Sequence, residues 1–184
     1  MVAPLVQPVL VPKSEAYPWP TINLDRVTLV GCVTRCRAAG VTYGLGAKAT
    51  SGPEQPGPGG FRRIDCSGFV GWALSQATGG RLPDLLDRGS VEQHDWIDAH
   101  GFKSSSVAAA IGHDDIVRVA FLPPALGGGI GHVMLVLDGL TLESHGGSRK
   151  APLYNGPDRR AWDVAAHPFM GTCMVYALTR PEAE

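Results

Sequence analysis

Apolar residues recur at helical spacing in the first half of the chain. Between residues 23 and 39 they return every three or four positions, and Gly40 follows as a stop. From Cys66 to residue 77 the same spacing forms an apolar stripe, closed by Gly79 and Gly80. Two shorter stretches repeat the pattern more weakly. The sequence therefore predicts helices over 23–39, 66–77, 91–99 and 105–111.

The second half of the chain has the pattern of strands. Runs of aliphatic and β-branched residues are separated by clusters of glycine and proline. They lie at 116–122, 132–138, 140–145 and 173–179. Asp138-Gly139, between two of the runs, is typical of a hairpin turn. Because helices come first and strands after, we expect an α+β fold with N-terminal helices packed on an antiparallel β-sheet.

The length of the chain favours one domain. Its 184 residues, 44% of them hydrophobic, are enough to bury one core. The first twenty residues hold five prolines, so we expect an extended proline-rich arm over 1–22 and a single domain over 23–180. Residues 50–60 hold three prolines and four glycines and are expected to form a surface loop.

Charge and cysteine spacing exclude several classes of function. Sixteen Lys and Arg against seventeen Asp and Glu give a net charge of −1, which disfavours nucleic acid as a partner. No run of eighteen apolar residues occurs, so we expect no membrane insertion. The amino terminus lacks the features of a secretory signal. The four cysteines do not have the spacing of paired zinc knuckles, and we expect neither a zinc site nor structural disulfides.

Cys66 begins the second predicted helix. The free N–H groups and the positive dipole end of a helix favour a thiolate at this position. The same N–H groups can receive the negative oxygen that develops when a thiolate attacks an amide carbonyl. Cys66 is therefore a candidate nucleophile; the alternative is a small core residue on the apolar stripe.

Two histidines flank the predicted hairpin. His132 opens one strand and His145 ends the next, and both lie six residues from the turn at Asp138-Gly139. In such a hairpin the two residues face each other directly. One imidazole would then take the thiol proton while the other fixes its tautomer. The alternative is that each histidine is an ordinary polar residue.

These residues together resemble a known family. The string DCSGFV at 65–70, then Gly131-His132-Val133, then His145, is similar to the motifs of the NlpC/P60 cell-wall cysteine peptidases. Tyr43-Gly44 resembles the tyrosine-glycine that precedes the nucleophile in that family. The resemblance extends over residues 29–147 and implies a papain-like α+β core.

The resemblance implies a role for each matched residue. Cys66 would be the nucleophile, His132 the general base and then acid, and His145 the residue that orients His132. Tyr43 would help to polarise the carbonyl. Asp65 and Ser67 would line the substrate pocket, where a carboxylate suits the free amino group of a peptide stem. Their own position equally favours capping of the helix.

The function implied is hydrolysis of an amide bond in peptidoglycan stem peptides, through an acyl-enzyme and without a metal or cofactor. The partner would be peptidoglycan or a muropeptide, and the bond that between γ-D-glutamate and a diamino acid. The alternatives are a thiol amidase or acyltransferase acting on another small amide or ester, and a non-catalytic wall-binding module. Such a protein would reach the wall as a phage-encoded component, as an injected effector or as an excised part of a secreted chain. Its oligomeric state stays open.

Overall fold

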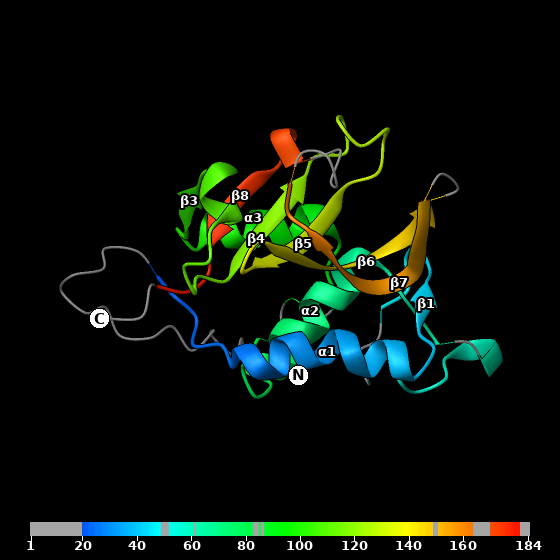
Figure 1. Ribbon diagram of the computed structural model, residues 1–184. Coiled ribbons are helices and arrows are strands. Elements are labelled where there is room, and N and C mark those ends of the chain that lie inside the picture. The colour runs from blue at the N-terminus through cyan, green and yellow to red at the C-terminus, as the bar shows by residue number, and fades with distance from the viewer. Residues whose placement is uncertain are drawn as a thin grey trace, which may run out of the picture.

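The computed structural model describes residues 20–48, 52–60, 62–82, 85, 87–148, 151–163 and 170–180. Figure 1 shows α1 and α2 below a long twisted sheet, with α3 beside β4 and β8. The helical elements are α1 (Arg26–Ala38), α2 (Cys66–Ala77) and α3 (Ser90–Ala99), with short 3-10 turns η1 (Pro58–Gly60), η3 (Ala108–Ile111) and η4 (Met170–Thr172). The strands are β1 (Thr42–Tyr43), β2 (Arg63–Ile64), β3 (Lys103–Ser105), β4 (Arg118–Leu122), β5 (His132–Leu137), β6 (Leu140–Ser148), β7 (Ala151–Ala161) and β8 (Met174–Ala177).

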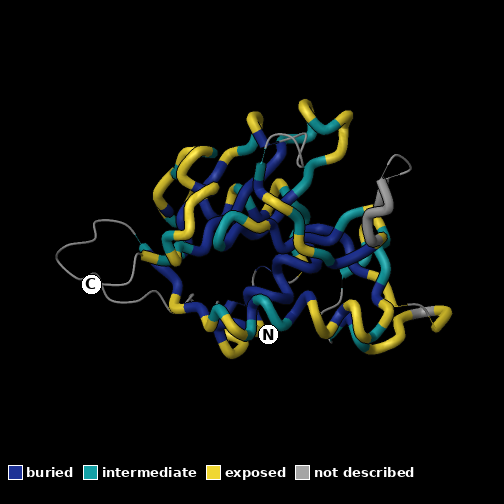
Figure 2. Tube along the Cα trace, viewed as in Figure 1, coloured by how far each residue is buried: buried dark blue, intermediate teal, exposed yellow. Residues whose placement is uncertain are grey.

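Six of these strands form one antiparallel sheet in the order β3-β8-β4-β5-β6-β7. The two short strands β1 and β2 pair in parallel beside it. Helices α1 and α2 share an apolar cluster with β4, β5 and β6 on one side of the sheet. A smaller cluster, which includes Met134, Trp162 and Met170, forms around residues of β4, β5 and β8. The α+β prediction is therefore confirmed, and Figure 2 shows that α2 and the central strands are the most deeply buried elements.

The hairpin between β5 and β6 forms at the predicted place. Asp138 and Gly139 both have positive φ, 52° and 69°, which is the backbone of the tight turn that Asp-Gly favours. Pairing next to the turn runs from Leu137 opposite Leu140 to Leu135 opposite Leu142. From Leu140 to Ser148, β6 also pairs with β7, its other neighbour in the sheet.

Two expectations need correction. The segment 105–111, predicted as a helix, is instead the end of β3 followed by the η3 turn. The Ala109 N–H of this turn donates to the Ser106 hydroxyl. The eleven-residue strand β7 was not predicted, because its sequence contains glycine, proline and charged residues; the edge position of β7 tolerates them. At the end of the predicted arm, the Ile22 N–H donates to the Leu178 carbonyl, and the Ile22 side chain is buried.

The rest of the predicted arm, residues 1–19, lies outside the described residues. Of the predicted loop at 50–60, residues 52–60 are described, and Glu54 forms an ion pair with Arg35 of α1 at 3.2 Å. Within the described part of the chain, none of the helices is long and apolar enough to cross a membrane.

Candidate active site

Cys66 is the first residue of α2, and Asp65 determines that start. Asp65 has extended backbone, and its Oδ1 accepts a hydrogen bond of 2.6 Å from the Gly68 N–H. The segment just before the helix is tied to the sheet, since the Ser144 hydroxyl of β6 donates to the Ile64 carbonyl at 2.9 Å. The sulfur is thereby held at the tip of a helix, next to the strands that carry the predicted histidines.

Gly68 is required where α2 meets the preceding loop. A Cβ added at Gly68 would lie 2.8 Å from the Ala47 carbonyl oxygen, which is closer than atoms can approach. The same carbonyl accepts the Asp65 N–H at 2.9 Å. The glycine of the DCSGFV string therefore lets the loop at residues 44–48 lie directly on the helix start.

His132 interacts with Glu143 and with Cys66. Its Nε2 lies 2.7 Å from Glu143 Oε2, and the Cys66 thiol is near enough to the ring to raise its pKa. Because Glu143 engages Nε2, Nδ1 is the ring nitrogen left for the thiol. Burial lowers the pKa of His132, but the bonds to Cys66 and Glu143 outweigh it and raise the pKa to about 10. The imidazole therefore carries a proton at neutral pH.

Glu143 is the carboxylate behind His132, and its side chain is fully buried on β6. Oε1 accepts a bond of 2.8 Å from the Thr141 hydroxyl and lies 3.7 Å from Arg160 Nη1. A buried carboxylate is tolerated when partners of this kind surround it. Cys66, His132 and Glu143 thus form a continuous row of thiol, imidazole and carboxylate.

The predicted role of His145 is corrected by this geometry. Glu143, and not His145, binds Nε2 of His132, so the carboxylate has the orienting place that was expected for His145. Glu143 and His145 lie two positions apart on β6, so their side chains lie on the same face of the sheet. If the register of the hairpin is continued, His145 is the residue opposite His132 and Glu143 is its diagonal neighbour. Burial lowers the pKa of His145 below its ordinary value, which keeps that ring neutral.

Glu143 could have been noticed in the sequence. It is a charged residue inside the apolar strand pattern LTLESH, and carboxylates are seldom fully buried without a partner. Direct pairing of two histidines across a symmetric turn was the simpler interpretation, and only the three-dimensional structure separates the diagonal neighbour from the opposite one.

Tyr43 lies beside this row of groups, at the end of β1. Burial, followed by interaction with Cys66 and Asp65, raises the pKa of the Tyr43 phenol to about 12. Its ring rests against Gly146, where an added Cβ would lie 3.4 Å from ring carbon Cδ1. Tyr43 therefore stays protonated and can donate a hydrogen bond.

Asp65 and Ser67 flank Cys66 and bind Lys48, a residue that the sequence did not single out. Lys48 Nζ lies 2.5 Å from Asp65 Oδ2 and 2.5 Å from Ser67 Oγ. Asp65 is thus the helix cap that its position favoured, and it also forms an ion pair with Lys48. No sequence pattern indicates this contact, because it depends on the path of the loop before the helix.

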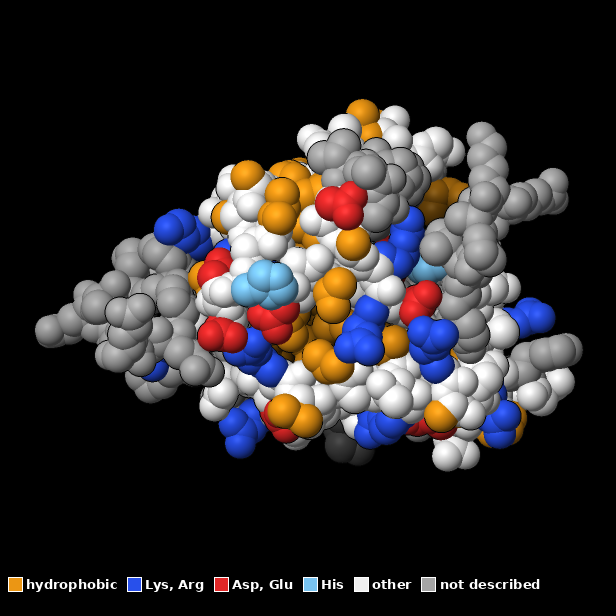
Figure 3. All heavy atoms as spheres, in the orientation of Figure 1, with side chains coloured by type: hydrophobic (Ala, Val, Ile, Leu, Met, Phe, Trp, Pro, Cys, Tyr) orange, Lys and Arg blue, Asp and Glu red, His pale blue; other side chains and the backbone are white. Residues whose placement is uncertain are grey.

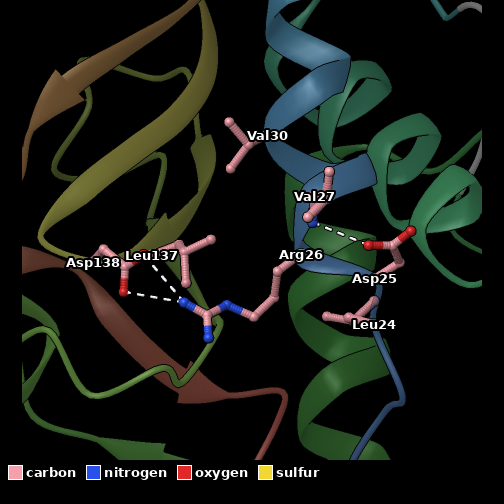
Figure 4. A pocket seen from close by; sticks show the side chains of 7 residues that line it. All are labelled: Leu24, Asp25, Arg26, Val27, Val30, Leu137 and Asp138. Atoms are coloured by element: carbon pink, nitrogen blue, oxygen red, sulfur yellow. Dashed lines mark hydrogen bonds and ion pairs between the residues drawn. The ribbon is translucent and has the colours of Figure 1, made fainter.

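A separate pocket of about 630 Å³ lies between the start of α1 and the turn joining β5 to β6. Its walls are the apolar side chains of Leu24, Val27, Val30 and Leu137, while Arg26 reaches across to Asp138 at 3.1 Å (Figure 4). Figure 3 shows hydrophobic side chains gathered in the middle of this face, between α1 and the sheet. None of the predicted site residues lines the pocket.

A thiol beside an imidazole that is backed by a carboxylate can give its proton to the ring, which leaves a thiolate beside an imidazolium. The imidazolium can then pass that proton to a leaving group. Among the residues that the structure describes, no group of three His, Cys, Asp or Glu side chains is placed to hold a metal ion. Comparison of the chain with models of protein families, with curated proteins and with solved structures finds no match.

Proposed function

We propose that this chain is a cysteine peptidase with a papain-like core of the NlpC/P60 kind, which hydrolyses an amide bond in peptidoglycan stem peptides. The single observation that carries the proposal is the row formed by Cys66, His132 and Glu143 at the tip of α2. The order of the matching motifs along the sequence supports the choice of family and substrate.

The first half of the reaction uses the thiolate of Cys66. It attacks the amide carbonyl carbon, and the carbonyl oxygen becomes negatively charged. The first N–H groups of α2 have no partner within the helix and, together with the Tyr43 hydroxyl, stabilise that oxygen. His132 then gives its proton to the departing amine, the carbon–nitrogen bond breaks, and the acyl group stays on the sulfur as a thioester.

The second half returns the enzyme to its starting state. His132, now neutral, removes a proton from water, and the resulting hydroxide attacks the thioester carbonyl. The carbon–sulfur bond breaks, the acid product leaves, and His132 is again protonated beside a thiolate. Glu143 stays bonded to Nε2 of His132 throughout and keeps that nitrogen in its donating role.

The proposed bond is that between γ-D-glutamate and the diamino acid of the stem, as the family resemblance implies. The test is digestion of purified peptidoglycan followed by mass analysis of the released fragments. We expect peptides from the wild type and none from Cys66→Ala. Cys173→Ala is the matched control, because Cys173 is a half-buried thiol that packs in the smaller apolar cluster. Equal release by wild type and Cys66→Ala would refute the proposal.

A further inference from the structure

The carboxylate next to the proposed nucleophile is already saturated by the chain itself. Asp65 Oδ1 accepts hydrogen bonds from the Gly68 N–H at 2.6 Å and from the Ser67 hydroxyl at 3.2 Å. Asp65 Oδ2 accepts bonds from the Gly46 N–H at 3.1 Å and from Lys48 Nζ at 2.5 Å. A carboxylate offers about four lone-pair sites, so none is left for an incoming ammonium group.

Ser67 is saturated in the same way. Its hydroxyl donates its one proton to Asp65 and accepts a bond of 2.5 Å from Lys48 Nζ. Lys48 therefore stands between the two groups that would otherwise receive the free amino group of a peptide stem. Its own ammonium occupies the position where the substrate amine was expected.

The backbone holds Lys48 in this position. The residues just before it are bonded to the helix cap, the Gly46 N–H to the Asp65 side chain and the Ala47 carbonyl to the Asp65 N–H. The Lys48 side chain is 20% exposed, whereas that of Asp65 is 6% exposed. Of the two side chains, the ammonium is therefore the more accessible to a ligand.

We propose that Lys48 is a specificity-determining residue, which makes the acyl side of the site reject a free ammonium group and select a stem peptide whose amino end is blocked by an acyl group. The inference rests on the proposed function for the identity of the substrate. The effect of Lys48 on which charged groups can approach Cys66 does not rest on the proposed function. Like charges brought together without water between them repel strongly, whereas a neutral amide is accepted.

The first experiment measures which charge reaches Cys66, and it requires no peptidase activity. Two methanethiosulfonates of similar size are used, one with a trimethylammonium group and one with a sulfonate. In each, the Cys66 sulfur attacks the sulfenyl sulfur, a mixed disulfide forms and methanesulfinate leaves. Peptide mapping by mass spectrometry follows Cys66 separately from the other three cysteines.

In the wild type we expect the anionic reagent to modify Cys66 faster than the cationic one. In Lys48→Gln, which removes the charge but can still donate a hydrogen bond to Asp65, this ratio is expected to fall by at least about tenfold. Lys48→Arg, which keeps the positive charge, should keep the wild-type ratio of the two rates. Lys103→Met, on the edge strand β3, should also leave that ratio unchanged. An unchanged ratio in Lys48→Gln overturns the inference.

The second experiment uses two synthetic stem peptides that differ only in a free or an acetylated amino terminus. The wild type is expected to cleave the acetylated peptide with a kcat/KM at least about tenfold higher. Better cleavage of the free amine by the wild type overturns the inference, even if every Lys48 variant fails to fold. If the wild type cleaves neither peptide, the proposed function fails, and the labelling ratio still decides the role of Lys48.

Discussion

Replacing Glu143 by Gln tests the row of groups most directly. Glutamine is close in size to glutamate and can still accept the hydrogen bond that His132 Nε2 donates at 2.7 Å, but the negative charge is removed. Because both His132 and Glu143 are largely shielded from solvent, with side chains 16% and 1% exposed, water cannot replace that charge. The substitution therefore isolates the electrostatic support of the imidazolium.

The expected magnitude follows from the pKa of His132. Its rise from 6.5 to about 10 is the net result of burial, which lowers it, and of the bonds to Cys66 and Glu143, which raise it. A hydrogen bond between charged groups contributes about 1.5–3 kcal/mol. Since one pKa unit corresponds to about 1.4 kcal/mol, Glu143→Gln should lower the pKa of His132 by about 1–2 units.

The pH dependence has a definite sign. The folded pKa of His132 is above its unfolded value, so the resulting stabilisation is present in full below pH 6.5 and is lost as the pH rises toward about 10. In Glu143→Gln this loss is complete at a lower pH. The alkaline limb of kcat/KM should move toward acid by the same interval, and the rate should fall about 10- to 100-fold.

Two measurements check this expectation. NMR titration of the His132 ring, assigned with His132→Gln, reports the pKa without any substrate. Initial rates on a soluble muropeptide across the same pH range report the limb. Glu54→Gln, in the loop that is ion-paired to α1, is the matched control for loss of one carboxylate. An unmoved titration curve in Glu143→Gln would show that the carboxylate does not support the imidazolium.

Three further substitutions test other contacts. Gly68→Ala should lower the free energy of unfolding by about 1–3 kcal/mol, because its Cβ would lie 2.8 Å from a loop carbonyl; in urea unfolding the control Gly31→Ala, which meets nothing within 4 Å, should not destabilise the fold. Tyr43→Phe should reduce kcat about 10- to 100-fold at nearly constant KM, since the lost hydroxyl acts on the developing oxyanion; a change confined to KM would contradict that role. His145→Ala should cost less activity than Glu143→Gln, because Glu143, and not His145, binds Nε2 of His132. The reverse order in matched assays would show that His145 orients the ring.

The elements with a clear local pattern were predicted well. The helix expected at 66–77 is α2, with the same bounds, because an apolar stripe, an N-terminal cap and a glycine stop all lie within that segment. The hairpin at Asp138-Gly139 formed for the same reason, since the turn depends on two adjacent residues. Strand β7 has no such pattern; its backbone pairing with β6 was visible only in the folded chain.

In the candidate site, too, the residues that depend on local sequence were predicted, and the contacts between distant segments were not. Cys66 at a helix start and His132 at a strand start can be read from the chain, because each depends on its immediate neighbours. The contact of His132 with Glu143 depends on which diagonal the paired strands present, and that of Lys48 with Asp65 on how a loop crosses the helix tip. The sequence by itself thus determined α2, the hairpin and the positions of Cys66 and His132 at the start of their elements. Only the tertiary structure decided which carboxylate supports the imidazole and which ammonium covers Asp65. These contacts join segments that are distant in the sequence, and no local pattern of residues shows that they meet.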